Sequence, residues 1–427
     1  MNKIELKGLD QTLYYEKLEN GLEVYLIPYE NKKNYTMHYV TKYGSIETKF
    51  IPYGEKEMIT VPDGIAHFLE HKMFEQEDGI DPFTFASKTG TYSNASTNYE
   101  CTRYYFEGNK AFKENLNYLL DFVGSPYFTD ENVEKEKGII AEEIKQYDDE
   151  VDWFFDEEMK KAMLNTDNHR IDIAGTVESI YKITKEDLYK TYYTFYQPSN
   201  MFLVISGTFD KDEAINIIKN NETLKKAKSN FKIKVNKEKE DVKISQKEVN
   251  TTFNIFNTKV GYGIKIPIKN NDRFLLNCYV ALMLNTKFGL SSLFREKIKK
   301  EELMTSFYVE RELIDDYLLI YFKADSNKPK ELIDAIKKEL EDITITDEEI
   351  NRMKRVWIAS SVMMTDDINL TVDNIIDDII TYHKVIDKKI DIYRSLNIKE
   401  YNKILKDIDF KNSCVVTITP NDSNIKE

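Results

Sequence analysis

The alternation of apolar and polar positions predicts β-strands in the first part of the chain. Residues 23–28 (EVYLIP) follow an Asn-Gly turn, and residues 35–43 form a second extended, alternating run. A continuous apolar run at 200–206 (NMFLVIS) is typical of a strand buried on both faces. These segments predict a sheet that contributes to a hydrophobic core.

Apolar residues at helical spacing predict helices from residue 64 onward. Residues 112–123 carry an apolar stripe, and 131–147 form a longer helix with Thr129 or Asp130 as its N-cap. Strands and helices occur in blocks and do not alternate strictly, which indicates an α+β fold.

The second half of the chain repeats features of the first. Thr129-Asp130-Glu131 aligns with Thr346-Asp347-Glu348, and QPSNMFLVIS at 197–206 resembles FKNSCVVTIT at 410–419. A lysine-rich, weakly periodic stretch at 221–250 lies between them. We therefore expect two similar halves, 1–225 and 226–427, each a mostly antiparallel sheet with helices packed on it.

The two halves differ in their charged residues. In the alignment of the repeat, Glu136 meets Met353 and Glu143 meets Ser360. The later half has a single histidine, His383. If the halves are duplicates, the charged chemistry belongs to the first.

Composition limits the class of protein. The chain has 427 residues, of which 41% are hydrophobic, enough for more than one domain core. Its net charge of −14 argues against nucleic acid as a partner. The three cysteines, Cys101, Cys278 and Cys414, are far apart, which fits a reducing compartment. The N-terminus lacks an apolar leader and no stretch approaches the ~20 apolar residues of a membrane span, so we expect a cytoplasmic protein without a membrane partner.

The residues that indicate chemistry are concentrated at 63–71 (DGIAHFLEH). His67 and His71 are four residues apart, so on a helix they lie about 40° from each other and can face one metal ion. Glu70 can reach the coordination position that catalytic zinc sites leave for water. The order His-x-x-Glu-His is an inverted zinc peptidase signature. The alternative is a pair of surface histidines beside a salt-bridging glutamate.

Two histidines need a third ligand, for which a carboxylate is suitable. The helix predicted at 131–147 offers four glutamates, Glu134, Glu136, Glu142 and Glu143. Glu136 and Glu143 are seven residues apart and share a face beside Ile139 and Ile140. Carboxylates on an apolar face need a partner, and a metal ion is one. An ordinary exposed helix explains the spacing equally well.

These segments resemble the pitrilysin/insulinase family of metallopeptidases. The matching segments are 64–75 (GIAHFLEHKMFE), like the family's zinc helix, and 136–144 (EKGIIAEEI), like its second helix. The resemblance implies that His67, His71 and Glu143 bind one Zn²⁺ per chain. It also implies that Glu70 is the catalytic base and that Glu136 supports catalysis. The ligand types would also accept cobalt or manganese.

Other segments resemble the family's substrate-binding parts. Residues 93–97 (SNAST) resemble the edge strand that receives the substrate backbone, which implies substrate contacts for Asn94 and Ala95. Residues 293–297 (LFREK) resemble a segment that precedes a substrate-binding arginine and tyrosine, for which Arg311 and Tyr317 are the candidates. An ordinary strand with a surface arginine and a half-buried tyrosine is the alternative.

The resemblance also implies an architecture and an activity. The family fold has two similar α+β halves, and a unit of this length forms one half of a clamshell peptidase. The partner would be a second copy or a related subunit. The implied activity is that of a zinc metalloendopeptidase acting on peptides or unfolded segments. The alternative is a non-catalytic or partner-dependent subunit that binds peptides or serves assembly.

Overall fold

The computed structural model describes residues 1–269 and 272–421, which form two compact units. Unit 1 consists of residues 1–146, 171–237 and 362–388. Unit 2 consists of the described residues within 147–170, 238–361 and 389–427. In the described part of the chain, no helix combines the length and the apolar character that crossing a membrane requires.

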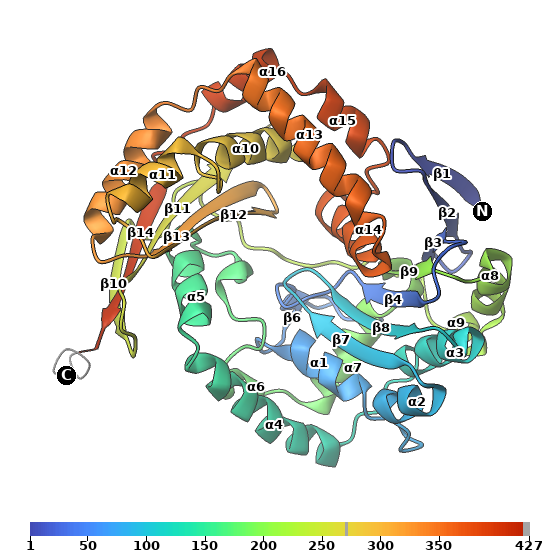
Figure 1. The fold of residues 1–427 in the computed structure, drawn as a ribbon. Helices are drawn as coiled ribbons and strands as arrows, with labels where there is room; N and C mark the ends of the chain where they lie inside the picture. Colours follow the sequence, from blue (N-terminus) through green and yellow to red (C-terminus); the bar gives the residue numbers. More distant parts are fainter. Residues whose placement is uncertain (270–271, 422–427) are drawn as a thin grey trace. The chain divides into compact units, whose positions relative to one another are not determined.

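Unit 1 is built on a sheet with the strand order β1-β2-β3-β9-β4-β8-β7 (Figure 1). Its strands are β1 (Asn2–Leu6), β2 (Gln11–Lys17), β3 (Glu23–Pro28), β4 (Tyr35–Thr41), β7 (Tyr92–Thr97), β8 (Thr102–Gly108) and β9 (Met201–Gly207). β3 and β9 run parallel, and the other neighbours in this sheet run antiparallel.

Helices cover both faces of this sheet, which explains the continuous apolar sequence of β9. Leu203 and Ile205 face a core that includes residues of α1, α3 and α7, whereas Phe202 and Val204 face α14. The helices of the unit are α1 (Ile65–Met73), α2 (Pro82–Thr89), α3 (Phe112–Val123), α4 (Asp130–Asp148), α6 (Val177–Ile180), α7 (Lys185–Phe195), α8 (Lys211–Asn220), α9 (Glu222–Lys226) and α14 (Ile368–Tyr382).

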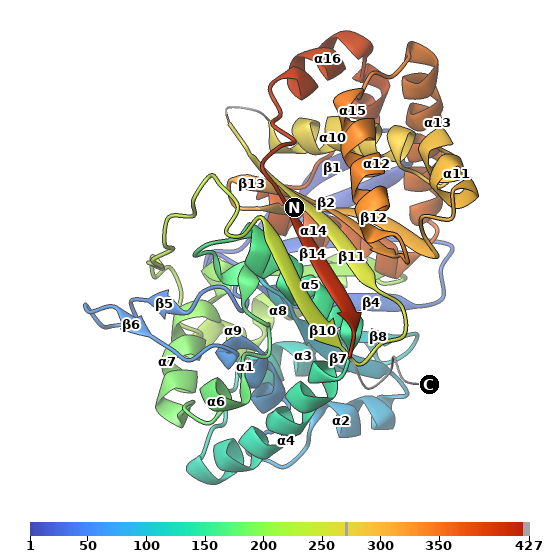
Figure 2. The same cartoon turned by 90° about the vertical axis from the view of Figure 1, so that its left-hand side faces the viewer.

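Unit 2 contains a sheet with the order β10-β14-β11-β13-β12, in which β10 and β14 run parallel (Figure 2). On β13, Tyr321 packs in a core with α5, and the next residue, Phe322, contacts Phe288 at the end of α10 on the other face. The strands are β10 (Glu248–Phe253), β11 (Lys259–Pro267), β12 (Ser306–Ile314), β13 (Tyr317–Asp325) and β14 (Ser413–Pro420). The helices are α5 (Val151–Met163), α10 (Arg273–Lys287), α11 (Leu293–Lys300), α12 (Pro329–Glu341), α13 (Asp347–Met364), α15 (Lys389–Ser395) and α16 (Ile398–Lys406).

The two sheets share one topology. In unit 1 the order β3-β9-β4-β8-β7 corresponds to first, fifth, second, fourth and third along the chain, and β10-β14-β11-β13-β12 follows the same order. In both five-strand orders the first pair, β3-β9 or β10-β14, is parallel and the other neighbouring pairs are antiparallel. β9 and β14, the two segments that resemble each other in sequence, occupy the same place. The predicted α+β class with two similar halves is confirmed.

The compact units are not contiguous in sequence. The helix α5 follows α4 but packs with unit 2, whereas α14 follows α13 but packs with unit 1. The domain boundaries inferred from the sequence repeat, 1–225 and 226–427, stay a prediction. The structure adds that each unit takes one helix from the other half, because the apolar faces of α5 and α14 are buried there.

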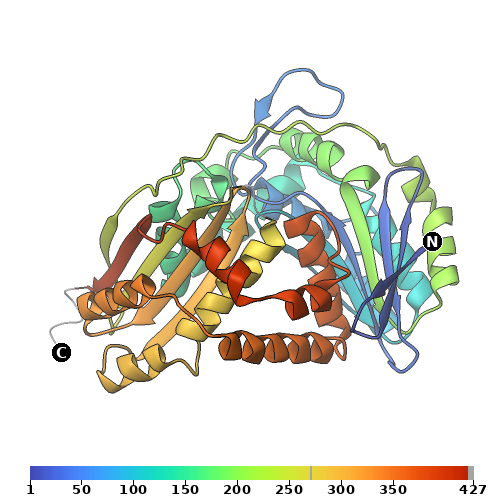
Figure 3. The same ribbon diagram turned by 90° about the horizontal axis from the view of Figure 1, so that it is seen from above.

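Several predicted elements have the expected bounds. The strand at 23–28 and the helix at 112–123 match, and the long helix begins with Thr129 as N-cap, since the Thr129 hydroxyl accepts the backbone N–H of Asn132 at 3.1 Å. The lysine-rich stretch contains α9 and then runs without regular structure until β10. Beside the hairpin β5 (Lys49–Phe50) and β6 (Ile59–Thr60) it makes one β-bridge, from Val235 to Phe50 (Figure 3).

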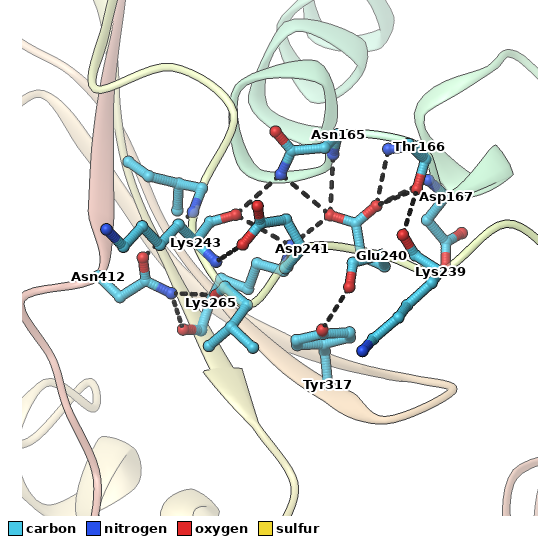
Figure 4. A network of polar contacts seen from close by, with 12 residues as sticks. Asn165, Thr166, Asp167, Lys239, Glu240, Asp241, Lys243, Lys265, Tyr317 and Asn412 are labelled. Atoms are coloured by element: carbon cyan, nitrogen blue, oxygen red, sulfur yellow. Dashed lines mark hydrogen bonds and ion pairs between the residues drawn. The ribbon is translucent and has the colours of Figure 1, made fainter.

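The later part of this stretch is fixed to unit 2 by Glu240 (Figure 4). The Glu240 carboxylate accepts the backbone N–H groups of Asn165, Thr166 and Asp167 at 2.7–2.8 Å, and it pairs with Lys265, whose side chain is fully buried. Burial by itself would raise the pKa of Glu240, but Lys265 and the three backbone donors lower it to about 2.

We predict that Glu240→Gln destabilises unit 2 by about 3 kcal/mol at pH 7, because it leaves the Lys265 ammonium buried without a counter-charge. The folded-state pKa of Glu240 lies below its ordinary value of 4.5. Its contribution is therefore complete above pH 4.5 and is lost as the pH falls toward 2. Between pH 4.5 and 2, the free energy of unfolding measured with urea should therefore fall less for Glu240→Gln than for the wild type.

The matched control is Glu238→Gln, because Glu238 is exposed. Its free energy of unfolding should equal that of the wild type. A Glu240→Gln chain that is as stable as the wild type at pH 7 would contradict the role of Glu240 as the counter-charge of Lys265.

Candidate metal centre

The helix α1 places His67 and His71 on one face, with ring centroids 4.6 Å apart. It begins after Gly64, whose φ of +86° is one that residues with a side chain rarely adopt. A Cβ at Gly64 would lie 2.2 Å from the carbonyl oxygen of Ala174, and a Cβ at Gly175 would lie 2.5 Å from that of Asp63. The two glycines let both backbones touch, which fixes the start of α1.

The helix α4 brings Glu143 to these histidines. The Glu143 carboxylate lies 3.8 Å from Nε2 of His67 and 3.6 Å from Nε2 of His71. One ligand atom from each residue lies within 4.8 Å of the other two, and within the described residues these three form the group that could hold a metal ion. Ligands about 2.0–2.1 Å from a tetrahedral zinc ion are roughly 3.3 Å apart, so the arrangement needs only small shifts to fit.

The neighbouring glutamate points elsewhere. The Glu142 side chain is 71% exposed and accepts a hydrogen bond from Lys145 at 2.7 Å on its own helix. Of the two adjacent glutamates, the structure therefore brings Glu143 to the histidines. The role of Glu143 as a ligand stays a prediction.

Glu136 precedes Glu143 by seven residues on the same face of α4, and it contacts Nδ1 of His71. Its Oε1 accepts a hydrogen bond from Nδ1 of His71 at 3.1 Å, because a carboxylate can only accept. In the neutral ring this leaves the lone pair of Nε2 on the side of Glu143. Burial would lower the pKa of His71, but the bond to Glu136 and the charges of Glu70, Glu136 and Glu143 outweigh burial and raise it. Burial would likewise raise the pKa of Glu136, and the contacts with His71 and Lys72 lower it.

His67 has a different environment. Its Nδ1 is buried without a hydrogen-bond partner, and burial together with the nearby His71 lowers its pKa to about 3. His67 is therefore neutral over the physiological range, the form that a metal ion requires.

Glu70 lies on the same turn of α1 and is only 8% exposed. Its Oε2 accepts a hydrogen bond from the Thr97 hydroxyl at 2.7 Å, at the end of β7. Burial raises the pKa of Glu70, and the bond from Thr97 offsets part of this rise. A carboxylate with a raised pKa, placed beside two candidate ligands, suits the acceptance and return of a proton.

The strand β7 is at the edge of the unit 1 sheet, where it pairs with β8 on one side. Asn94 donates to the Tyr92 hydroxyl at 2.8 Å, and its side-chain oxygen accepts the backbone N–H of Ala95 at 2.9 Å. Next to this strand is a cavity of about 580 Å³. It is lined by Glu70, His71, Phe74, Glu75, Gln76, Gly79, Asp81, Phe83, Asn94, Lys135 and Glu136.

Arg311 and Tyr317 lie in unit 2. The Arg311 guanidinium donates from Nε to the side chain of Asn277 at 2.7 Å. Tyr317 is buried, and its hydroxyl donates to the carbonyl oxygen of Glu240 at 3.1 Å, within the network of Figure 4. Contact of either residue with a substrate stays a prediction.

Two contacts of the site were missed in the sequence. In the sequence, Thr97 is only the last residue of the segment that resembles the substrate strand. Its hydrogen bond to Glu70 depends on how β7 packs against α1. Lys72 follows His71 directly, and its side chain is fully buried between Glu75 and Glu136. The signal for Lys72 was its position four residues after Phe68, on the apolar face of the predicted helix.

Comparisons with known proteins identify the family and the fold. Residues 60–177 match the family model described as insulinase (peptidase family M16), and residues 182–356 match the peptidase M16 inactive domain. A Bacillus subtilis (strain 168) protein with the name uncharacterized zinc protease YmfH is 41% identical over 367 residues. The match covers 83% of this chain and 84% of that protein.

Solved structures show the same fold. An M16-like peptidase from Alicyclobacillus acidocaldarius has a TM-score of 0.91 and 30% identity, covering 97% of this chain and 99% of that one. The periplasmic protease PqqL from Escherichia coli has a TM-score of 0.75 and 19% identity, covering 97% of this chain but 48% of PqqL. This chain is therefore equivalent to about half of that protein in fold.

We predict that Glu143→Ala abolishes stoichiometric zinc binding, whereas Glu142→Ala retains about one zinc per chain. Removal of a ligand should weaken zinc binding by more than the roughly 10–100-fold that removal of an orienting group causes. Metal content of the dialysed proteins, measured by mass spectrometry, checks this. Equal zinc content in both variants would show that Glu143 is not a ligand.

Proposed function

This chain belongs to the pitrilysin/insulinase family, peptidase family M16, and on that premise we propose that it is a zinc-dependent endopeptidase of the inverted His-x-x-Glu-His type. The observation that carries the proposal is the convergence of His67, His71 and Glu143, with Glu70 beside them. The names of its relatives, zinc proteases, support the same reaction class.

The residues of α1 and α4 have separate tasks in the proposed reaction. A bound zinc ion would supply Lewis acidity toward water and the scissile carbonyl. Glu70 accepts the proton of the attacking water and delivers it to the leaving amine. Thr97 keeps the Glu70 carboxylate in place for both transfers. Glu136 holds the ring of His71 in one orientation and tautomer.

Substrate recognition follows from the position of β7. An extended peptide adds to a sheet edge through backbone hydrogen bonds, which accept many sequences. Asn94 and Ala95 lie on this edge, and the adjacent cavity of about 580 Å³ offers room for one substrate side chain. We therefore assign peptides and unfolded segments as the substrate class.

A second chain of similar fold would complete the peptidase. The basis is that this chain is equivalent in fold to 48% of PqqL. The partner would be a second copy of this chain or a related subunit. Arg311 and Tyr317 are the further candidates for contacts with the substrate. A partner-dependent peptide-binding subunit is the alternative function, favoured by the match of residues 182–356 to a domain described as inactive.

We predict that Glu70→Gln retains zinc but lowers the rate of peptide hydrolysis by about 10²–10⁴, because the proton acceptor is lost while the ligands remain. Cleavage of an internally quenched peptide, measured beside metal content, checks this. Glu77→Gln is the control, since Glu77 is exposed on the segment after α1 and should cleave at the wild-type rate. A Glu70→Gln chain as active as the wild type would refute the mechanism.

We also predict that the specific activity of the purified chain rises with its concentration, because a second copy completes the site. Activity and sedimentation measured over the same dilution series check this. A zinc-loaded chain that stays inactive at every concentration would favour the partner-dependent alternative.

A further inference from the structure

A buried lysine adjoins the candidate metal centre. The Lys72 side chain has no exposed surface, although lysine is among the residues least often fully buried. Its neighbours on α1, Phe68 and Leu69, belong to the hydrophobic core of unit 1. An ammonium in such a place destabilises the fold unless it has counter-charges, so its contacts indicate its task.

Those contacts lead to the candidate ligands. Nζ of Lys72 lies 3.7 Å from Oε2 of Glu136, and the other oxygen of the same carboxylate accepts the hydrogen bond from Nδ1 of His71. The Glu136 side chain is 12% exposed, so water contributes little to holding it. Each oxygen of Glu136 thus has a separate partner, which restricts rotation of the carboxylate.

We infer that Lys72 is a positioning residue for the metal centre, acting on His71 through Glu136. This inference rests on the proposed metal site of His67, His71 and Glu143. Without the positive charge of Lys72, the Glu136 carboxylate loses its counter-ion and one of its two anchors. Glu136 then holds the ring of His71 less firmly in the orientation that directs Nε2 at a bound metal ion, and zinc affinity falls.

Lys72 also pairs with Glu75, at the end of the same helix, and this pair offers a purely local explanation for the lysine. The two explanations differ in what they predict. If the local pair were the whole role, Glu75→Gln would reproduce the effect of removing Lys72. If Lys72 acts through Glu136, Glu75→Gln leaves zinc affinity within about threefold of the wild type, and Glu136→Gln weakens it.

The chain supplies a matched control. Lys137 is also a buried lysine, with 7% of its side chain exposed, and it pairs with Glu134 three residues earlier on α4. Lys137→Met removes a buried charge of the same kind whose ion pair, with Glu134, includes neither Glu136 nor a candidate ligand. Methionine keeps most of the apolar volume of the lysine stem in both places.

The experiment measures zinc dissociation constants by competition with a chelator. The proteins compared are the wild-type chain, Lys72→Met, Lys72→Arg, Glu75→Gln, Glu136→Gln, the double variant Lys72→Met/Glu136→Gln and the control Lys137→Met. We expect Lys72→Met to weaken zinc binding about 10–100-fold. Lys72→Arg should restore most of the affinity. The double variant should bind no more weakly than Glu136→Gln, because both changes remove the same support. Lys137→Met should bind like the wild type.

Equal zinc affinity in the wild type and Lys72→Met, or additive losses in the double variant, would overturn the inference while leaving the proposed function intact. Absence of zinc binding in the wild type would instead overturn the proposed function. Unfolding of the metal-free proteins shows whether each variant is folded. If Lys72→Met is not, Lys72→Gln, which keeps a polar end without charge, takes its place under the same criteria.

Discussion

Two imidazoles and three carboxylates meet between α1 and α4, and the repulsion among the carboxylates is the constraint that the surrounding structure has to satisfy. Glu70 is held by a hydroxyl from β7. Glu136 is held between His71 and Lys72. Glu143 is the carboxylate that faces both histidines, and a divalent cation placed there would satisfy its charge and the lone pairs of the rings together.

The sheet of unit 1 provides the frame for this arrangement. β7 is at its edge, so this strand holds Glu70 through Thr97 and has no further strand of the sheet on its other side. Unit 2 repeats the strand order of β3-β9-β4-β8-β7, and its described residues hold no comparable group of candidate metal ligands. Its long helix α13 buries Met353 where α4 has Glu136 in the sequence repeat. An apolar residue there removes the carboxylate without disturbing the packing that the shared fold needs.

The connection between the halves is also held by a buried charge pair. Glu240 and Lys265 compensate each other inside unit 2, and the carbonyl oxygen of Glu240 takes the hydroxyl of Tyr317. The tyrosine that resembles a substrate-binding residue therefore has a structural partner in this unit.

The local pattern of apolar and polar residues determined many of the helices and strands of this protein. The strand at 23–28 and the helix at 112–123 followed from apolar spacing, and the common direction of His67 and His71 followed from one helical turn, because these properties depend on neighbours in the chain. The α+β class and the repeat were also predicted from the sequence. Glu143 was chosen over Glu142 through the resemblance, whereas the approach of its carboxylate to both histidines depends on how α4 packs against a helix about 70 residues earlier in the sequence. The burial of Lys72 and the exchange of α5 and α14 between units were decided by tertiary structure alone, because burial is set by contacts between residues that are distant along the chain.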